Sequence, residues 1–244
     1  MIGVEHFVKY QEKSQQSYGG KKFRIAVEGN IASGKSTLLK KLSQINGVEV
    51  LIEPVDKWRN LNGGNVIGRM YEDAPRWGFL FQSYVLVTMM ELHNKPLTSP
   101  ICLLERSVFS ARYCFVENLH KNKVIDDMEY GCYCHWFDYI MKQNPPHVDL
   151  IVYLRTSPDV CFERLQQRGR KEEQPVTRAY LQSLHDRYEE WLSNEKHHSW
   201  HGNVPVLVID GNEDASINSG IHTEHCSNIL SKLDITHHQL SLPH

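Results

Sequence analysis

The sequence predicts an α/β fold in which a five-stranded parallel sheet is flanked by helices. Five short apolar runs alternate with longer stretches of helical spacing, and this alternation is typical of strand–helix–strand units. The runs are apolar throughout, as expected for strands that are covered on both faces. The 244 residues suit one large domain with a sizeable core. In such sheets ligands bind beyond the carboxyl ends of the strands, so functional residues are expected there.

The apolar runs are the expected strands, and turn residues mark where they begin or stop. Gly29 follows the first run, and Pro54 stands just after the second, where a proline cannot continue a central strand. Pro100 leads into the third run. In chain order, the expected strands are Phe23 to Glu28, Val48 to Ile52, Ile101 to Leu104, Asp149 to Leu154 and Pro205 to Ile209.

Helical spacing fills the gaps between these runs. The expected helices are Lys35 to Leu42, Phe79 to Leu92, and about 109–119, 127–143, 158–168, 176–194 and 217–233. Residues 1–20 are polar, and the stretch after Leu233 is rich in His and Gln. We therefore expect a single domain over residues 21–233, with a flexible N-terminal segment at 1–20 and a flexible C-terminal tail at 234–244.

Composition argues against some classes of partner. The net charge is −2, so no strong field favours nucleic acid or acidic membranes. No apolar run approaches the roughly 18–20 residues of a membrane helix, and the first twenty residues lack the apolar core of a secretion signal. The six cysteines are scattered, which suits a reducing compartment. We therefore expect an intracellular protein that binds neither nucleic acid nor membranes, in the cytoplasm or nucleus by preference, with the mitochondrion left open.

Residues 29–36 carry the strongest signal, because they match the pattern G-x-x-x-x-G-K-[ST] at every fixed position, between a strand and a helix. The glycines let the backbone curl so that its N–H groups face phosphate oxygens, and the next helix offers its N-terminus to an anion. Lys35 can place a cation between the β- and γ-phosphates, and the Ser36 hydroxyl can bind Mg²⁺. The predicted ATP phosphate-binding residues are Gly29, Asn30, Ile31, Ala32, Ser33, Gly34, Lys35, Ser36 and Thr37.

Two more strand ends carry charged side chains on the same rim. Glu53 closes the second strand, where a carboxylate could accept a proton from an attacking hydroxyl. Glu105 and Arg106 close the third strand: the acid can hold Mg²⁺, and the arginine can pair with a carboxylate or a phosphate. Each side chain alone is also explained as a solvated strand end or a surface ion pair. The rim they share with the glycine loop favours the functional interpretation, with Ser36 and Glu105 at the metal.

A basic segment follows the fourth strand. Arg164 and Arg168 are four residues apart and share a helix face, and Arg170 comes just after the hinge that Gly169 offers. Arginines there could close over the transferring phosphoryl group and stabilise its charge. We therefore expect Arg164, Arg168 and Arg170 to form a lid. The alternative is a solvated helix end with mixed ion pairs, and the glycine loop at residues 29–36 weighs against it.

Several strings are together very specific: residues 29–37, 53–58, 81–85, 105–107, 110–118 and 153–158. In these strings the chain resembles the deoxyribonucleoside kinases, and most of all the branch of insect multisubstrate and mitochondrial thymidine kinases. The resemblance runs from about Phe23 to Leu192, with a weaker echo at 206–215. It implies a P-loop kinase that moves the γ-phosphate of Mg·ATP to the 5′-hydroxyl of a deoxyribonucleoside in nucleotide salvage. It also implies a homodimer and feedback by a deoxynucleoside triphosphate.

The resemblance implies roles for single residues. Glu53 matches the family's general base for the sugar 5′-hydroxyl, and Arg106 matches the arginine that steadies it, so both are predicted to be catalytic. Tyr71 and Glu173 match the pair that holds the sugar 3′-hydroxyl, which favours deoxyribose by crowding out a 2′-hydroxyl. The predicted substrate-binding residues are Glu53, Trp58, Tyr71, Gln82, Val85, Met89, Arg106, Ala111, Phe115 and Glu173, and the predicted adenine loop is Glu213, Asp214 and Ala215.

The choice of base rests on one helix face. Gln82, Val85 and Met89 share that face, and the amide of Gln82 can pair with the edge of more than one base. A plain core helix is a fair alternative for Val85 and a poor one for Gln82, because a buried amide needs partners. In relatives that prefer deoxycytidine or purines, the position of Ala111 is acidic and that of Met89 is often arginine. The uncharged pair in this chain favours thymidine and deoxycytidine, with slower use of purines.

Three other classes of protein have this kind of fold. A nucleoside monophosphate kinase needs extra cations for the acceptor phosphate, and the surroundings expected around Gln82 are uncharged. A GTPase is disfavoured because the sequence lacks the pattern N-K-x-D. A non-catalytic scaffold, like the related accessory subunit of respiratory complex I, has no need for the charged residues described above.

Overall fold

The computed structural model describes residues 22–193, 204–213, 224–225, 228–229 and 231–232. The segments expected to be flexible, 1–20 and 234–244, lie outside these residues. Asp214 and Ala215 of the predicted adenine loop also lie outside them. The extent of the single domain, 21–233, stays a prediction.

A five-stranded parallel sheet forms the centre of the molecule, in the order β2-β3-β1-β4-β5. This confirms the predicted fold class. Each strand boundary lies within one residue of the prediction, because the apolar runs that defined the strands are largely buried in β1, β3 and β4 and partly buried in β2 and β5. The strands are β1 (Phe23–Glu28), β2 (Val48–Leu51), β3 (Ile101–Glu105), β4 (Leu150–Arg155) and β5 (Val206–Asp210).

Helices and helical turns connect the strands. The α-helices are α2 (Lys35–Leu42), α3 (Val55–Arg59), α4 (Val66–Glu72), α5 (Ala74–His93), α6 (Val108–Ser110), α7 (Glu117–Lys121), α8 (Asp127–Gln143), α9 (Pro158–Arg168) and α10 (Arg178–Tyr188). Two π-helical segments, Ala111–Val116 and Glu189–Ser193, continue α6 and α10, and Lys171–Glu173 forms a 3₁₀ turn. Of the helix expected at 217–233, only the short described pieces are helical.

The helical prediction misses α3 and α4 and begins α5 too late. The two missed helices have five and seven residues, too few for a repeating apolar pattern to stand out. Helix α5 begins five residues before the expected Phe79, because the Asp73 side chain accepts the Arg76 N–H and caps the helix there, with a proline in the first turn.

Alternate residues of each strand face two different layers. On one face, Ile25 and Leu103 belong to a core cluster with the buried leucines of α2. On the other face, Leu104 packs with residues of α5 and α8, and Ala26 packs with Tyr188 of α10. Covering both faces explains why the strand sequences are apolar throughout.

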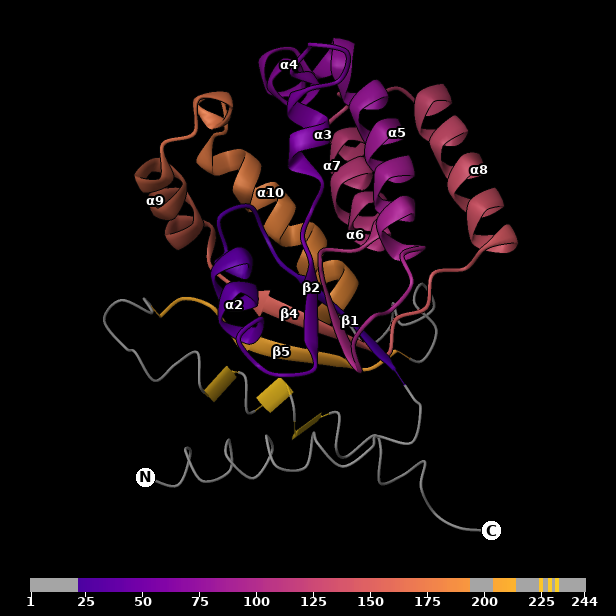
Figure 1. The fold of residues 1–244 in the computed structure, drawn as a ribbon. Helices are drawn as coiled ribbons and strands as arrows, with labels where there is room; N and C mark the ends of the chain where they lie inside the picture. The colour runs from indigo at the N-terminus through magenta and orange to yellow at the C-terminus, as the bar shows by residue number, and fades with distance from the viewer. Residues whose placement is uncertain (1–21, 194–203, 214–223, 226–227, 230, 233–244) are drawn as a thin grey trace.

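The helices are arranged so that one rim of the sheet stays open to a ligand. Figure 1 shows α9 and α10 on its left, α5 and α8 on its right, and α3 and α4 at the top. The carboxyl ends of β1 and β3 lie side by side, because Val27 pairs with Glu105 in the sheet. Among the helices that the structure describes, none combines the length and apolar character needed to cross a bilayer.

Candidate functional site

A cavity of about 510 Å³ lies at this rim. Its walls come from the loop before α2, from α3, α4 and α5, and from the segment that spans α9 and the 3₁₀ turn. Residues 31–37 of the glycine loop line one end, and Trp58 and Gln82 line another part. Glu53, Glu105 and Arg106 line the same space. One cavity therefore contains both the predicted phosphate cradle and most of the predicted substrate-binding residues.

The glycine loop has the backbone geometry expected of a phosphate cradle. Gly29 and Gly34 have φ values of 147° and 103°, which side chains rarely allow. A Cβ at Gly29 would lie 2.6 Å from the carbonyl oxygen of Leu154, so a larger residue does not fit there. Asn30 holds the loop from inside: its amide donates to the Leu181 carbonyl at 2.8 Å, and its oxygen accepts the next backbone N–H at 2.8 Å.

Lys35 lies folded into this loop. Its ammonium group donates to the carbonyl oxygens of Gly29 at 3.0 Å and Asn30 at 2.6 Å. Burial lowers the pKa of Lys35 to about 7, and the nearby charge of Arg106 acts in the same direction. A bound phosphate would favour the charged form of this lysine, so its protonation is coupled to anion binding.

Ser36 and Glu105 meet beside the cradle. The Ser36 hydroxyl, at the start of α2, donates to Glu105 Oε1 at 2.5 Å, and Glu105 is the last residue of β3. A hydroxyl and a carboxylate are hard oxygen donors, and Mg²⁺ is commonly held by one or two such groups together with phosphate oxygens and waters. The pair therefore fits a magnesium ion at the phosphate end of the cavity.

Arg106 connects Glu53 to the glycine loop. Its Nη1 donates to Glu53 Oε2 at 2.6 Å, and its Nη2 donates to the Gly29 carbonyl at 3.2 Å. Both side chains are largely buried, and the carboxylate raises the pKa of Arg106 against the opposing effect of burial. Glu53 is thus held at the cavity wall by a permanent cation, next to the loop that can hold phosphates.

The side-chain amide of Gln82 lies in an apolar pocket of the same cavity. Gln82 is 3% exposed, and its Oε1 has no hydrogen-bond partner among the described residues. Trp58 and Phe81 meet edge to face with ring centroids 5.6 Å apart, and the indole donates to Thr88 Oγ1 at 2.9 Å. A buried acceptor without a partner is costly, so it points to a ligand that donates a hydrogen bond here.

Tyr71 and Glu173 are further polar side chains that line the cavity, between this pocket and the basic segment. Burial, together with Tyr180 and Glu173, raises the pKa of the Tyr71 phenol. Glu173 is buried and accepts three hydrogen bonds from Arg168, at 2.7, 2.8 and 3.1 Å. Arg170 lies 3.4 Å from the same carboxylate. The structure therefore brings Tyr71, Glu173 and two of the three expected lid arginines together.

Arg164 differs from the other two arginines. Its guanidinium donates to the carbonyl oxygens of Ser33 at 3.2 Å, Gly211 at 2.7 Å and Glu213 at 2.9 Å. These contacts tie helix α9 to the glycine loop and to the loop after β5. Glu213, the described member of the predicted adenine loop, is therefore attached to the phosphate cradle through Arg164.

Two predicted substrate-binding residues lie behind the cavity wall. Met89 and Ala111 are 1% and 4% exposed and belong to the core cluster that includes Trp58 and Val85, but they are not among the residues lining the cavity. Val85 lines the cavity, and so does Phe115, whose ring lies 5.1 Å from the guanidinium carbon of Arg106.

Sequence reasoning missed several lining residues. Ile67 and Met70 come from α4, which was not predicted, and Val55 comes from α3. It also missed Glu28 and Tyr188, which lie behind Arg106 and are fully buried. Glu28 had a recognisable signal, because it is a carboxylate that ends a largely apolar and buried strand.

Comparisons with known proteins find one family model and several similar proteins. The family model described as deoxynucleoside kinase matches residues 25–233. The human protein named thymidine kinase 2, mitochondrial, is 47% identical over 202 residues, which cover 83% of this chain and 73% of that protein. A probable deoxycytidine kinase of fowlpox virus is 39% identical, covering 84% and 86%. Human deoxycytidine kinase is 35% identical, covering 82% and 88%.

Proposed function

The chain belongs to the deoxynucleoside kinase family, and we propose that its cavity transfers the γ-phosphate of ATP to the 5′-hydroxyl of thymidine and deoxycytidine. The family makes the protein a deoxynucleoside kinase with ATP as the phosphate donor. The choice of pyrimidine acceptors and the roles of single residues are our proposal. The observation that carries it is the shared cavity: the glycine loop, Glu53 and the pocket around Gln82 line one continuous space.

In the proposed reaction the 5′-oxygen attacks the γ-phosphorus in line with the leaving β-phosphate. Glu53 takes the proton of the attacking hydroxyl, because its carboxylate lines the cavity near the glycine loop while Glu105 is paired with Ser36. Arg106 holds Glu53 in place through the 2.6 Å hydrogen bond. Lys35 and the lid arginines Arg168 and Arg170 stabilise the charge on the transferring group, and most of the rate comes from positioning and electrostatics.

Ser36 and Glu105 are the proposed protein ligands of Mg²⁺. When bound, the ion would neutralise phosphate charge and orient the donor. The hydroxyl and the carboxylate lie 2.5 Å apart at the phosphate end of the cavity, and this arrangement supports their assignment.

The residues that line the cavity explain how the acceptor is recognised in this proposal. We assign the base to the pocket of Trp58, Phe81, Val85 and Gln82, where the unpartnered Oε1 accepts an N–H of the base and the amide N–H₂ donates to a carbonyl of thymine or to the ring nitrogen N3 of cytosine. Met89 and Ala111 shape this pocket from the core behind it, and as uncharged residues they favour a neutral pyrimidine.

The sugar is assigned to the polar groups between this pocket and the lid. Tyr71 and Glu173 hold its 3′-hydroxyl in this proposal, and the ring of Phe115 forms part of the same cavity wall. The Arg168–Glu173 pair then links sugar binding to the lid, because one carboxylate serves both.

A panel of acceptors tests the proposed function. Thymidine, deoxycytidine, deoxyadenosine, deoxyguanosine and thymidine monophosphate are each incubated with Mg·ATP, and the products are separated. We expect the two pyrimidine nucleosides to react with the highest kcat/KM and the monophosphate to be inert. The monophosphate acting as the better acceptor would instead identify a nucleoside monophosphate kinase and overturn the proposal.

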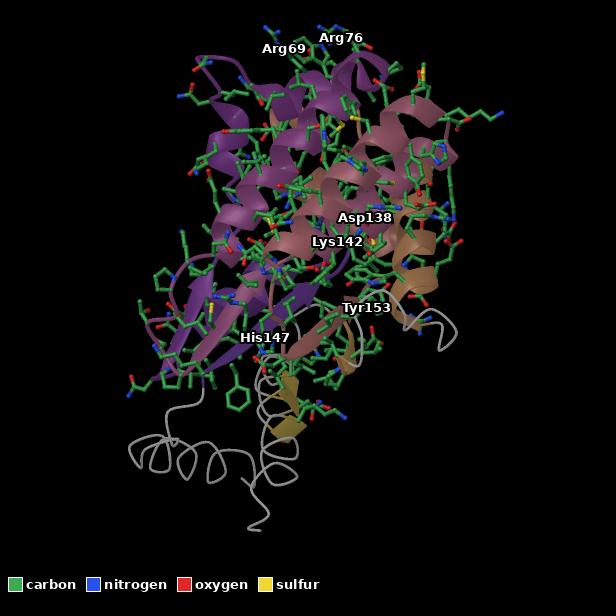
Figure 2. All side chains as sticks on the ribbon, turned by 90° about the vertical axis from the view of Figure 1, so that its right-hand side faces the viewer. Arg69, Arg76, Asp138, Lys142, His147 and Tyr153 are labelled. Carbon is green, nitrogen blue, oxygen red and sulfur yellow. The ribbon has the colours of Figure 1, made fainter. Side chains whose placement is uncertain are left out.

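We also infer a homodimer that forms through α5 and α8. These two helices pack against each other, and exposed apolar side chains lie on them. Figure 2 is turned so that α8 faces the viewer, with Asp138 and Lys142 labelled on it. The exposed apolar residues of this face are Leu80, Val87, Met128, Trp136 and Tyr139. Exposed apolar side chains on two packed helices are typical of a subunit interface.

Feedback by a deoxynucleoside triphosphate is a further part of the proposal. Since one cavity holds both the base pocket and the phosphate cradle, the triphosphate of the acceptor nucleoside could occupy both sites together.

The five described cysteines are free, which supports the expected reducing, intracellular compartment. Cytoplasm, nucleus or mitochondrion stays a prediction.

A further inference from the structure

The guanidinium of Arg106 has a third contact, on the side away from Glu53 and the glycine loop. Its Nε donates to the hydroxyl of Tyr188 at 3.2 Å. Tyr188 is the last residue of α10 and is 82 residues away in sequence. We propose that Tyr188 and Glu28 are positioning residues, which hold the Arg106 guanidinium so that it presents Glu53 to the acceptor hydroxyl. This inference rests on the proposed function, because it assigns a role within that reaction.

Arg106 needs such support because its backbone has a strained conformation. Its φ is +60°, a left-handed value that is uncommon for residues with a side chain. Its N–H donates to the Val27 carbonyl at 2.9 Å, so the residue turns sharply while still attached to the sheet. The guanidinium then contacts Glu53, Gly29 and Tyr188 in three directions. Three contacts in one plane determine both the position and the tilt of a rigid fork.

The Tyr188 hydroxyl can accept from Arg106 only if its own proton points elsewhere. A phenol carries one proton, and Glu28 Oε2 lies 3.5 Å from the hydroxyl oxygen as its acceptor. Donation toward Glu28 turns the oxygen lone pairs toward the Arg106 Nε–H. Glu28 thereby sets the direction of the Tyr188 hydroxyl, and the Tyr188 hydroxyl sets the direction of Arg106.

Glu28 is well placed to orient the Tyr188 hydroxyl. It is fully buried, and its Oε1 accepts from the Ser107 hydroxyl at 2.5 Å. Burial raises the pKa of the Glu28 carboxyl, while Ser107 and the charge of Arg106 act in the opposite direction. Ser107 follows Arg106 in the chain, and Glu28 precedes Gly29, whose carbonyl accepts from Arg106. Glu28 therefore contacts the surroundings of Arg106 on both sides.

Ring stacking keeps the Tyr188 hydroxyl from moving. The rings of Tyr188 and Tyr153 are stacked with centroids 5.7 Å apart and planes 13° from parallel, and Trp191 lies against Tyr188 at 6.2 Å. Tyr153, labelled in Figure 2, comes from β4, and its hydroxyl donates to Glu189 at 2.8 Å, away from Arg106. Tyr153 and Tyr188 thus form a matched pair: two stacked, buried phenols, of which only one contacts Arg106.

The test compares Tyr188→Phe with Tyr153→Phe in steady-state assays with thymidine and Mg·ATP. Losing a hydrogen bond to a charged group corresponds to about a tenfold to hundredfold effect, so we expect kcat of Tyr188→Phe to fall by at least about tenfold. The KM values for both substrates should change by less than about threefold, since Tyr188 does not line the cavity. Tyr153→Phe should keep kcat within about twofold, because it loses a comparable hydroxyl elsewhere. An equal fall in both variants would mean general loosening of the core and would overturn the proposal.

Glu28→Gln gives a second variant in case Tyr188→Phe does not fold. With its oxygen accepting from Ser107, the Gln amide nitrogen can only donate toward Tyr188, so the phenol loses its acceptor. We expect kcat to fall by about three- to tenfold with little change in KM. A kcat equal to that of the wild type would show that Glu28 does not position Arg106.

Side-chain NMR provides a readout that does not depend on turnover. In the wild type, the Arg106 Nε–H should give a protected signal, assigned by its loss in Arg106→Lys. Tyr188→Phe should shift this signal and speed its exchange with water, and Tyr153→Phe should leave it in place. An unchanged signal in Tyr188→Phe would refute the hydrogen bond. If the wild type phosphorylates no deoxynucleoside, the proposed function fails, and the NMR result still decides whether Tyr188 holds Arg106.

Discussion

At the scale of single residues, the site is a small group of charges that fix one another. Arg106 lies between Glu53 and the glycine loop, Lys35 donates to carbonyls of that loop, and Glu105 accepts from Ser36. Few of these charges face water, so each interaction is stronger than it would be at the surface. The consequence is most visible for Lys35, whose pKa falls to about 7 because it is buried.

The lowered pKa of Lys35 predicts that ATP binding takes up a proton. At pH 8 the free lysine is mostly neutral, and bound phosphates favour its charged form, so binding should take up about one proton. For the same reason, ATP affinity should fall as the pH rises above 7. Calorimetry at pH 8, in buffers with different ionisation enthalpies, measures this uptake.

Lys35→Arg is the matched control for this experiment. Arginine stays charged in proteins at every working pH, so its variant should take up no proton at this position. Proton uptake that is the same in the wild type and in Lys35→Arg would contradict the account of Lys35.

The residues of the site differ in how far the sequence reveals them. The glycine loop could be predicted in full, because its chemistry needs fixed residue types at fixed spacing within one segment. The contact between Arg106 and Tyr188 could not, because it joins residues 82 positions apart and depends on the left-handed backbone of Arg106. The core position of Met89 was also hidden, since periodicity assigns a helix face but not the depth of a cavity.

At the scale of elements, the segment between α9 and α10 is attached to the rest of the cavity by ion pairs. Arg168, the last residue of α9, pairs with Glu173 of this segment, and Arg59 of α3 donates to Glu172 at 2.8 and 2.5 Å. Helix α3 also carries Trp58, a wall of the base pocket. The Arg59–Glu172 pair therefore joins the wall of the base pocket to the lid.

A double-mutant cycle on Arg59 and Glu172 tests this connection. Each single alanine variant should raise the KM for thymidine by about three- to tenfold, because a partly buried ion pair contributes on the order of 1 kcal/mol or more. The double variant should be no worse than either single variant, since both lose the same contact. The measurement is steady-state kinetics with thymidine varied.

The Asp159–Arg178 pair is the control for this cycle. It joins α9 to α10, and both side chains are more than half exposed, so Arg178→Ala should leave the KM nearly unchanged. Additive effects in the Arg59 and Glu172 cycle would mean that the two side chains act separately.

Long elements were predictable and short ones were not. The strands and α8 follow from runs of apolar residues or from helical spacing over many residues. Helix α4 begins at a local cap, where Asn65 accepts the Gly68 N–H at 2.9 Å, and it packs against α5. Helix α3 has no such cap and contacts α5 through Trp58. The strand order could not be derived, because pairing between distant strands leaves no periodic mark in the sequence.

At the scale of the whole molecule, two surfaces have different roles. The rim of the sheet holds the cavity, and α5 and α8, which carry the exposed apolar residues, lie on the right-hand side of Figure 1. Helix α5 belongs to both, because Gln82 lines the cavity and Val87 is 52% exposed on the outer face. Dimer formation through this face would therefore stiffen the helix that recognises the base.

Substitutions on this face test the proposed dimer. Met128 and Tyr139 are 80% and 61% exposed, so Met128→Glu combined with Tyr139→Glu should preserve the monomer fold. A charge placed in an apolar interface is costly, so we expect this variant to sediment as a monomer where the wild type sediments as a dimer. Val208→Glu, at an exposed apolar position on β5, should remain dimeric. A dimeric double variant would place the interface elsewhere.

The role of Glu53 is the point on which the mechanism depends, and Glu53→Gln tests it most directly. The amide keeps the size of the side chain and can still accept from Arg106, but it cannot take a proton from the 5′-hydroxyl. The decisive measurement is kcat with thymidine beside the dissociation constant of Mg·ATP. We predict that kcat falls by about a hundredfold to ten-thousandfold while ATP affinity stays within about twofold. Near-normal turnover in Glu53→Gln would contradict the account.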